Sequence, residues 1–189
     1  MIFTTFFVKK TEKYRLSLSF CILVTIILEP YKLTVLGFQA SIALVFLYFF
    51  AIIHIVKLKK LSLLYTLICS YIIMMSYASF LLFELYDPVW VLLDRTWLLG
   101  VILSYVCVLL HQKNWNRVYI LVIGLIQGDF MYSLVLRNIG IGYSVGTERF
   151  FDVLAACFMV LFIWSFAEAI MMNLDQYLDS QTRGKHKST

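Results

Sequence analysis

The sequence predicts an all-α fold, a polytopic transmembrane bundle of six helices with both termini in the cytoplasm. Of its 189 residues, 62% are hydrophobic and 14% are charged, whereas soluble domains contain about 45–50% apolar and about 25% charged residues. The apolar residues fall into six runs, each close to the roughly 20 residues that cross a bilayer as a helix. Lysines and arginines form short clusters between these runs, which is typical of membrane topology signals.

The six runs define the predicted helices of a single transmembrane domain, residues 1–172. The predicted helices are 14–31, 33–56, 61–84, 89–110, 118–136 and 150–172. Because proline ends a helix, Glu29-Pro30 predicts a tight turn after the first of them. The short connections predict antiparallel neighbours. A polar cytoplasmic tail, residues 173–189, is expected to fray and then lose regular structure.

The distribution of positive charge predicts the orientation of the bundle. In this layout twelve of the sixteen Lys and Arg residues lie on the side of the N-terminus, and Lys32, Arg95, Arg137 and Arg149 lie on the other side. Positive residues near the ends of membrane helices stay in the cytoplasm. The N- and C-termini are therefore both expected inside.

Motifs for catalysis or metal binding are not convincing in this sequence. The four cysteines lie singly inside apolar runs, without the spacing of a zinc site or a disulfide framework. Residues Gly142–Gly146 match the G-x-S-x-G pattern, but they connect two predicted membrane helices, and His54 and His111 belong to the other side. We predict no catalytic residue, no metal and no cofactor. The loop is either a flexible connection or a mobile lid.

Polar residues predicted to lie inside the membrane are the candidate site. Asp129 and its neighbour Gln127 lie near the middle of the fifth helix, where a charge costs at least about 2.5 kcal/mol. Arg95 is the expected partner of Asp129, with Asp94 competing for it, and Asp152 enters the sixth helix from the same side. The cluster is interpreted either as a structural pair that fixes helix register or as an outward-facing cavity. Such a cavity would bind a cation, a proton or a lipid headgroup.

Small residues four positions apart predict close helix packing. They are Gly124 and Gly128 in the fifth helix, and Thr96, Gly100 and Ser104 in the fourth. Residues with this spacing share one helix face, and small side chains let backbones approach. The Gly124/Gly128 face predicts either homodimerisation or packing within one bundle, and the number of helices favours packing. The expected partners are the lipid bilayer and, beyond it, a membrane protein or another copy of this chain. Nucleic acid is not expected.

Three short polar islands in the second half suggest a family. They are Pro88 with Leu93-Asp94-Arg95, then Gln127-Gly128-Asp129, then Phe151-Asp152. With them the chain resembles the small multi-pass membrane proteins of Bacillus and its relatives, the YphA-like group. The resemblance implies a bacterial plasma-membrane protein and carries over no catalytic residue. We expect a non-enzymatic accessory or assembly protein, or alternatively a small transporter or ion/proton-coupled protein using Asp129, Arg95 and Asp94.

Overall fold

The computed structural model describes residues 14–35, 38–56, 59–87, 94–111 and 114–186. In these ranges it contains six helices and one two-stranded antiparallel sheet. The helices are α2 (Tyr14–Leu28), α3 (Ile42–Val56), α4 (Lys60–Tyr86), α5 (Arg95–Leu110), α6 (Asn114–Asn138) and α7 (Glu148–His186). The strands are β1 (Lys32–Val35) and β2 (Phe38–Ser41). The predicted bundle of six helices is therefore confirmed, with a hairpin in addition.

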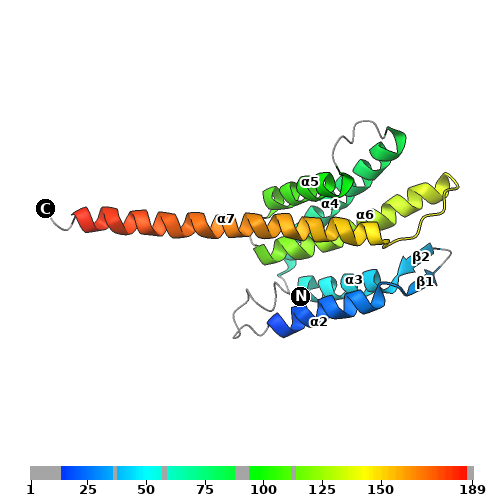
Figure 1. Cartoon of the computed structure of the whole chain (residues 1–189), viewed down its shortest axis with the longest axis horizontal. Helices are drawn as coiled ribbons and strands as arrows, with labels where there is room; N and C mark the ends of the chain where they lie inside the picture. Colours follow the sequence, from blue (N-terminus) through cyan, green and yellow to red (C-terminus); the bar gives the residue numbers. More distant parts are fainter. Residues whose placement is uncertain (1–13, 36–37, 57–58, 88–93, 112–113, 187–189) are drawn as a thin grey trace.

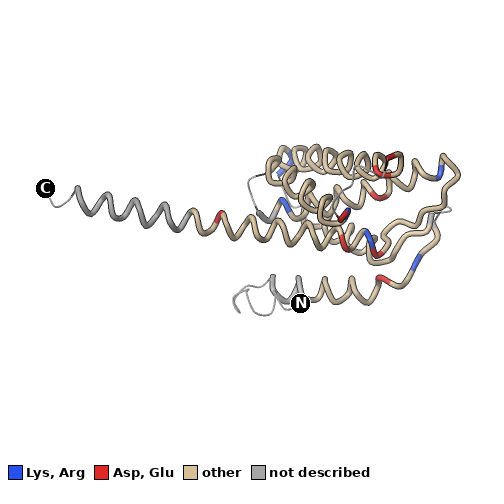
Figure 2. The backbone as a smooth tube through the Cα atoms, turned by 45° about the horizontal axis from the view of Figure 1, so that its top comes forward, with Lys and Arg blue, Asp and Glu red and all other residues tan. Residues whose placement is uncertain are grey.

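The helices lie along a common direction and alternate up and down (Figure 1). Helix α4 packs along α6, α5 along α7, and α3 against both α2 and α6. The β-hairpin and the α6–α7 connection lie together at one end, called here the hairpin end. The beginning of α2 lies towards the opposite end, beyond which α7 projects. Figure 2 shows that acidic residues gather in the half of the bundle nearer the hairpin end.

Three helices are long and apolar enough to cross a membrane. They are Lys60–Tyr86, Asn116–Asn138 and the first part of α7, Glu148–Met171. Helices α3 and α5 are apolar but shorter, with 15 and 16 residues. At ~1.5 Å per residue, these two cover somewhat less than the roughly 30 Å of hydrocarbon in a typical bilayer.

The predicted second helix, 33–56, is wrong in its first part. Residues 32–35 and 38–41 form the antiparallel hairpin, and the helix begins only at Ile42. Ser41 supports the turn before the hairpin, because its Oγ donates a hydrogen bond to the carbonyl oxygen of Glu29 (3.2 Å). A short apolar run does not distinguish a strand from a helix by hydrophobicity alone. The hairpin lies at the end of the bundle and extends no membrane helix.

Two further predicted boundaries are also wrong. Helix α5 begins at Arg95 instead of residue 89, because the Asp94 side chain caps it by accepting a hydrogen bond from the backbone N–H of Thr96 (3.3 Å). Helix α7 continues to His186 instead of ending at residue 172. The segment after residue 172 contains no proline, so the loss of apolar residues ends the membrane-compatible stretch without ending the helix.

The predicted small-residue faces lie against helices of the same chain. A Cβ atom added to Gly124 would lie 2.8 Å from the Ser70 carbonyl oxygen of α4, and one on Gly128 would lie 2.8 Å from the ring of Tyr77. Gly100 of α5 is equally close to Ala156 of α7, at 2.9 Å. These glycines let α6 approach α4, and α5 approach α7, more closely than any other residue would.

Candidate functional site

Asp129 of α6 is completely buried and fully engaged. Its exposed fraction is 0%. The Tyr143 hydroxyl donates to Oδ1 and the Gly146 backbone N–H donates to Oδ2, both at 2.7 Å. Tyr77 of α4 is a third hydrogen-bonding neighbour of the same carboxyl group. Donors from one helix and one loop therefore replace the water that a carboxylate would lose on burial.

The α6–α7 connection folds back over Asp129 and is held there. Gly146 has φ 75°, a left-handed conformation that favours glycine, and a Cβ at this position would lie 3.0 Å from a Leu44 methyl group. Val145 pairs with the hairpin, because its N–H donates to Gln39 O (2.7 Å) and its carbonyl accepts from Ser41 N (3.0 Å). In this structure the loop is anchored between the hairpin and α6, which does not match a free lid.

Tyr143 is suited to donate a hydrogen bond at this position. Burial and the nearby Asp129 carboxyl group raise the pKa of its phenol above the ordinary value. The hydroxyl therefore keeps its proton. The Tyr143 ring also packs edge-on against Tyr132 of α6, with centroids 5.1 Å apart.

The predicted ion pair between Arg95 and Asp129 is wrong. Arg95 pairs instead with Glu84 at the end of α4, with 3.0 Å between Nε and Oε2. The prediction placed Arg95 several residues inside a helix that began at 89. Because Asp94 caps α5, Arg95 is its first residue and lies at the end of the bundle, while Asp94 caps the helix instead of competing for Arg95.

The remaining predicted site residues are dispersed. The Gln127 amide nitrogen lies 3.5 Å from the Tyr48 hydroxyl, which connects α6 to α3. Asp152 is exposed on α7. The structure thus brings Asp129 close to Arg95 without pairing them, and it leaves Gln127 and Asp152 outside the Asp129 network.

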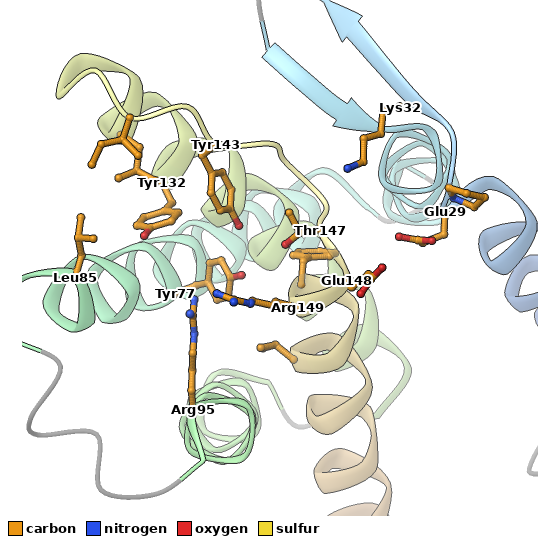
Figure 3. Close-up of a pocket in the computed structure, with 15 residues that line it drawn as sticks. Glu29, Lys32, Tyr77, Leu85, Arg95, Tyr132, Tyr143, Thr147, Glu148 and Arg149 are labelled. Atoms are coloured by element: carbon orange, nitrogen blue, oxygen red, sulfur yellow. The ribbon is translucent and has the colours of Figure 1, made fainter.

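A cavity of about 640 Å³ lies beside the Asp129 network at the hairpin end. Figure 3 shows the side chains that line it, which come from α4, α5, α7, the hairpin region and the loop. Its charged and aromatic residues are Glu29, Lys32, Tyr77, Arg95, Tyr132, Tyr143, Glu148, Arg149 and Phe150. Asp129 thus fixes the loop that forms one wall of the cavity.

A second charged pair, missed by the sequence reasoning, lies at the opposite end. Arg117 of α6 is 4% exposed, and its Nη1 lies 3.1 Å from each carboxylate oxygen of Glu168 on α7. Its Nε also donates to the His111 carbonyl oxygen. Trp164 donates to Glu168 at 2.7 Å. The signal in the sequence was Glu168 itself, an acidic residue deep in an apolar run, which requires a partner.

The partners of Asp129 were present in a motif considered only for catalysis. Tyr143 and Gly146 flank Ser144 in the G-x-S-x-G pattern. A buried carboxylate needs several donors, and a glycine-rich loop offers backbone N–H groups. These facts could have connected the loop to Asp129.

Comparison with known proteins gives the family. The model of the YphA-like integral membrane proteins matches residues 1–187. The chain belongs to this family. The YphA-like resemblance seen in the sequence is therefore confirmed, and the protein is an integral membrane protein. A YphA-family relative, "Uncharacterized protein YphA" of Bacillus subtilis (strain 168), is 27% identical over 187 residues, which cover 98% of this chain and 92% of the relative. No solved structure matches the chain.

Proposed function

We propose that this YphA-like protein is a non-enzymatic accessory protein of the bacterial plasma membrane, with its recognition site in the cavity at the hairpin end. The observation that carries the proposal is the position of the cavity. Its lining residues belong to the hairpin end, and tightly packed apolar side chains lie between it and the Arg117–Glu168 pair. This arrangement suits binding from one side of the membrane.

The interior between the two charged sites supports binding over transport. Its fully buried side chains include Leu99, Leu103, Leu121 and Leu125. The buried hydroxyl groups nearby are already used: Ser104 Oγ, for example, donates to Cys157 O at 3.1 Å. Permeation pathways are lined by polar groups or water-filled cavities. An interior of this composition favours a closed bundle.

The positions of the histidines support a non-enzymatic role. Ser144 lies in the loop at the hairpin end, whereas His54 and His111 lie near the ends of α3 and α5 away from it. A serine nucleophile needs a base within hydrogen-bond reach. If Ser144 is not a nucleophile, a serine-reactive probe should label wild type and Ser144→Ala equally. Labelling that is lost only in the variant would contradict the proposal.

A small proton-coupled transporter is the second candidate. The fully buried Asp129 carboxyl group beside the cavity favours it, because ionisable residues inside membranes often mark ion or proton paths. The two candidates differ in whether water reaches the centre of the bundle.

Thiol labelling distinguishes the two candidates and also tests the orientation. Cys107 and Cys157 are buried in the interior and serve as native probes. A charged, membrane-impermeant methanethiosulfonate reagent is added to intact cells and to vesicles of both orientations, and mass spectrometry identifies the modified residues. We expect Arg149→Cys to react in intact cells, Lys59→Cys to react only after permeabilisation, and Cys107 and Cys157 to stay unmodified. Reaction of Cys157 as fast as that of Arg149→Cys would instead support the transporter.

A further inference from the structure

The cavity contains charged groups that the protein does not neutralise internally. In the described part of the chain, the ion pairs within 4.0 Å are Arg95–Glu84 and Arg117–Glu168. Arg149 and Lys32 line the cavity and take part in neither pair. A cavity with unpaired cations attracts an anionic group, since the cations gain more from an ion than from water in a partly enclosed site.

Two of these cations converge. Figure 3 shows Arg95 reaching in from α5 and Arg149 from the first turn of α7, with their side chains pointing toward one another below Tyr77. Two guanidinium groups facing each other repel unless an anion lies between them. Their planar donor sets match the oxygens of a phosphate group better than a single point charge would.

The other walls indicate what is attached to that anion. Glu29 and Glu148 line the cavity without an ion pair among the described residues, so they can accept hydrogen bonds from hydroxyl or ammonium groups. Leu85 and Ile141 also line the cavity, yet they are 44% and 45% exposed on the outside of the bundle. The cavity therefore has a polar interior and an apolar edge, which suits a polar head attached to a hydrocarbon chain.

We infer that the cavity binds a phosphate ester, with its phosphate group between Arg95 and Arg149 and its headgroup hydroxyl or ammonium facing Glu29 and Glu148. This inference rests on the proposed function and gives its binding site a ligand class. The apolar edge favours a phospholipid of the membrane leaflet at the hairpin end. A water-soluble phosphate ester offers the same chemistry without the chain.

The test measures binding to the purified full-length protein in detergent. The probes are dioleoylphosphatidylglycerol, dioleoylphosphatidylethanolamine, sn-glycerol 3-phosphate, and dioleoylglycerol, which lacks phosphate. Native mass spectrometry and ligand-dependent thermal shifts report the affinity. Arg149→Gln removes the proposed contact, and Arg137→Gln is the matched control because Arg137 is an exposed arginine at the same end that does not line the cavity.

We expect one or both phospholipids to bind wild type and Arg137→Gln equally, and Arg149→Gln at least about tenfold more weakly, as for loss of a charge-assisted contact. Arg149→Gln should unfold at the wild-type temperature without lipid, which shows that folding is intact. Equal binding of glycerol 3-phosphate, also lost in Arg149→Gln, would support the phosphate site with a soluble source.

Two results would overturn the inference: dioleoylglycerol binding as tightly as the phospholipids, or Arg149→Gln binding like wild type. If either result occurred while Cys107 and Cys157 remained protected from thiol reagents, the ligand assignment would fall and the proposed function would stand. Labelling of those cysteines would instead remove the proposed function.

Discussion

Helix α6 carries one buried charged residue near each end, and the protein accommodates them in different ways. At the hairpin end, Asp129 accepts hydrogen bonds from neutral donors, including a backbone N–H and a phenol, both contributed by the loop that follows the helix. At the opposite end, Arg117 meets a second charge, Glu168, contributed by α7.

The difference shows how each end of the bundle is organised. The Arg117–Glu168 pair joins two helices directly, so it fixes how α6 lies against α7. Asp129 organises a loop, and the loop in turn forms a wall of the cavity. A buried charge therefore shapes a binding surface at the hairpin end and a helix contact at the opposite end. The predictions below test this contrast.

The largest effect is expected between the two ends, where α6 rests on α4. Gly124→Leu would place a side chain where even a Cβ lies 2.8 Å from the Ser70 carbonyl oxygen, so α4 and α6 must separate. Overpacking of this kind costs about 1–3 kcal/mol or more. We expect little folded monomer by size-exclusion chromatography in detergent. Gly142→Ala, with no atom within 4 Å of the added Cβ, should behave as wild type. A monodisperse, stable Gly124→Leu variant would show that this face is not packed against α4.

Removing the carboxyl group at the hairpin end should have the next largest effect. Asp129→Ala leaves the Tyr143 hydroxyl and the Gly146 N–H buried without an acceptor, which costs roughly 1–3 kcal/mol for each group. Asp129→Asn keeps one acceptor oxygen and should be milder. Thermal unfolding in detergent measures both variants. Asp152→Asn, at an exposed position, is the matched control and should leave the midpoint unchanged. Equal midpoints for Asp129→Ala and wild type would contradict the assigned role.

At the opposite end the effect should be smaller, because one partner is partly hydrated. The side chain of Glu168 is 34% exposed. Breaking a fully buried pair costs about 3–5 kcal/mol, so we expect roughly half of that for Glu168→Gln. A double-mutant cycle with Arg117→Gln should give a favourable coupling energy between the two residues. Strictly additive effects would mean that the pair does not join α6 to α7.

The smallest effect is expected for a single hydrogen bond of the loop. Tyr143→Phe removes the hydroxyl donor but keeps Gly146 N–H on Asp129, and a typical loss is about 1 kcal/mol. Ser144→Ala, next to it in the loop, is the control for a neutral change. The thermal midpoint should fall in Tyr143→Phe and stay constant in Ser144→Ala. The reverse order would contradict the hydrogen-bond assignment.

The sequence predicted the helices well because hydrophobic run length is a strong signal in membranes. It failed where geometry depends on capping and turns. Asp94 as a helix cap moved the start of α5 by several residues, and that shift alone removed Arg95 from the predicted depth of Asp129. The hairpin at residues 32–41 was hidden because its strands are as apolar as a helix end.

Asp129 was predicted to need a partner, and this prediction rested on the energetic cost of burial. The nature of the partner could not be predicted from helix positions. It lies in a loop whose path depends on Gly146 adopting a positive φ and on Val145 pairing with the hairpin. Contacts made by irregular backbone leave no periodic signal in the sequence. Arg117 was interpreted only as a topology signal, although the structure buries it against Glu168.

Hydrogen–deuterium exchange of the α6–α7 loop in nanodiscs tests most directly whether Asp129 anchors that loop. Peptides covering residues 139–147 are compared in wild type, Asp129→Ala and Asp152→Asn, with peptides around Arg117 as an internal reference. The account predicts slow exchange of the loop in wild type and Asp152→Asn, faster exchange in Asp129→Ala, and no change around Arg117. Loop exchange that is equally fast in all three proteins would contradict it.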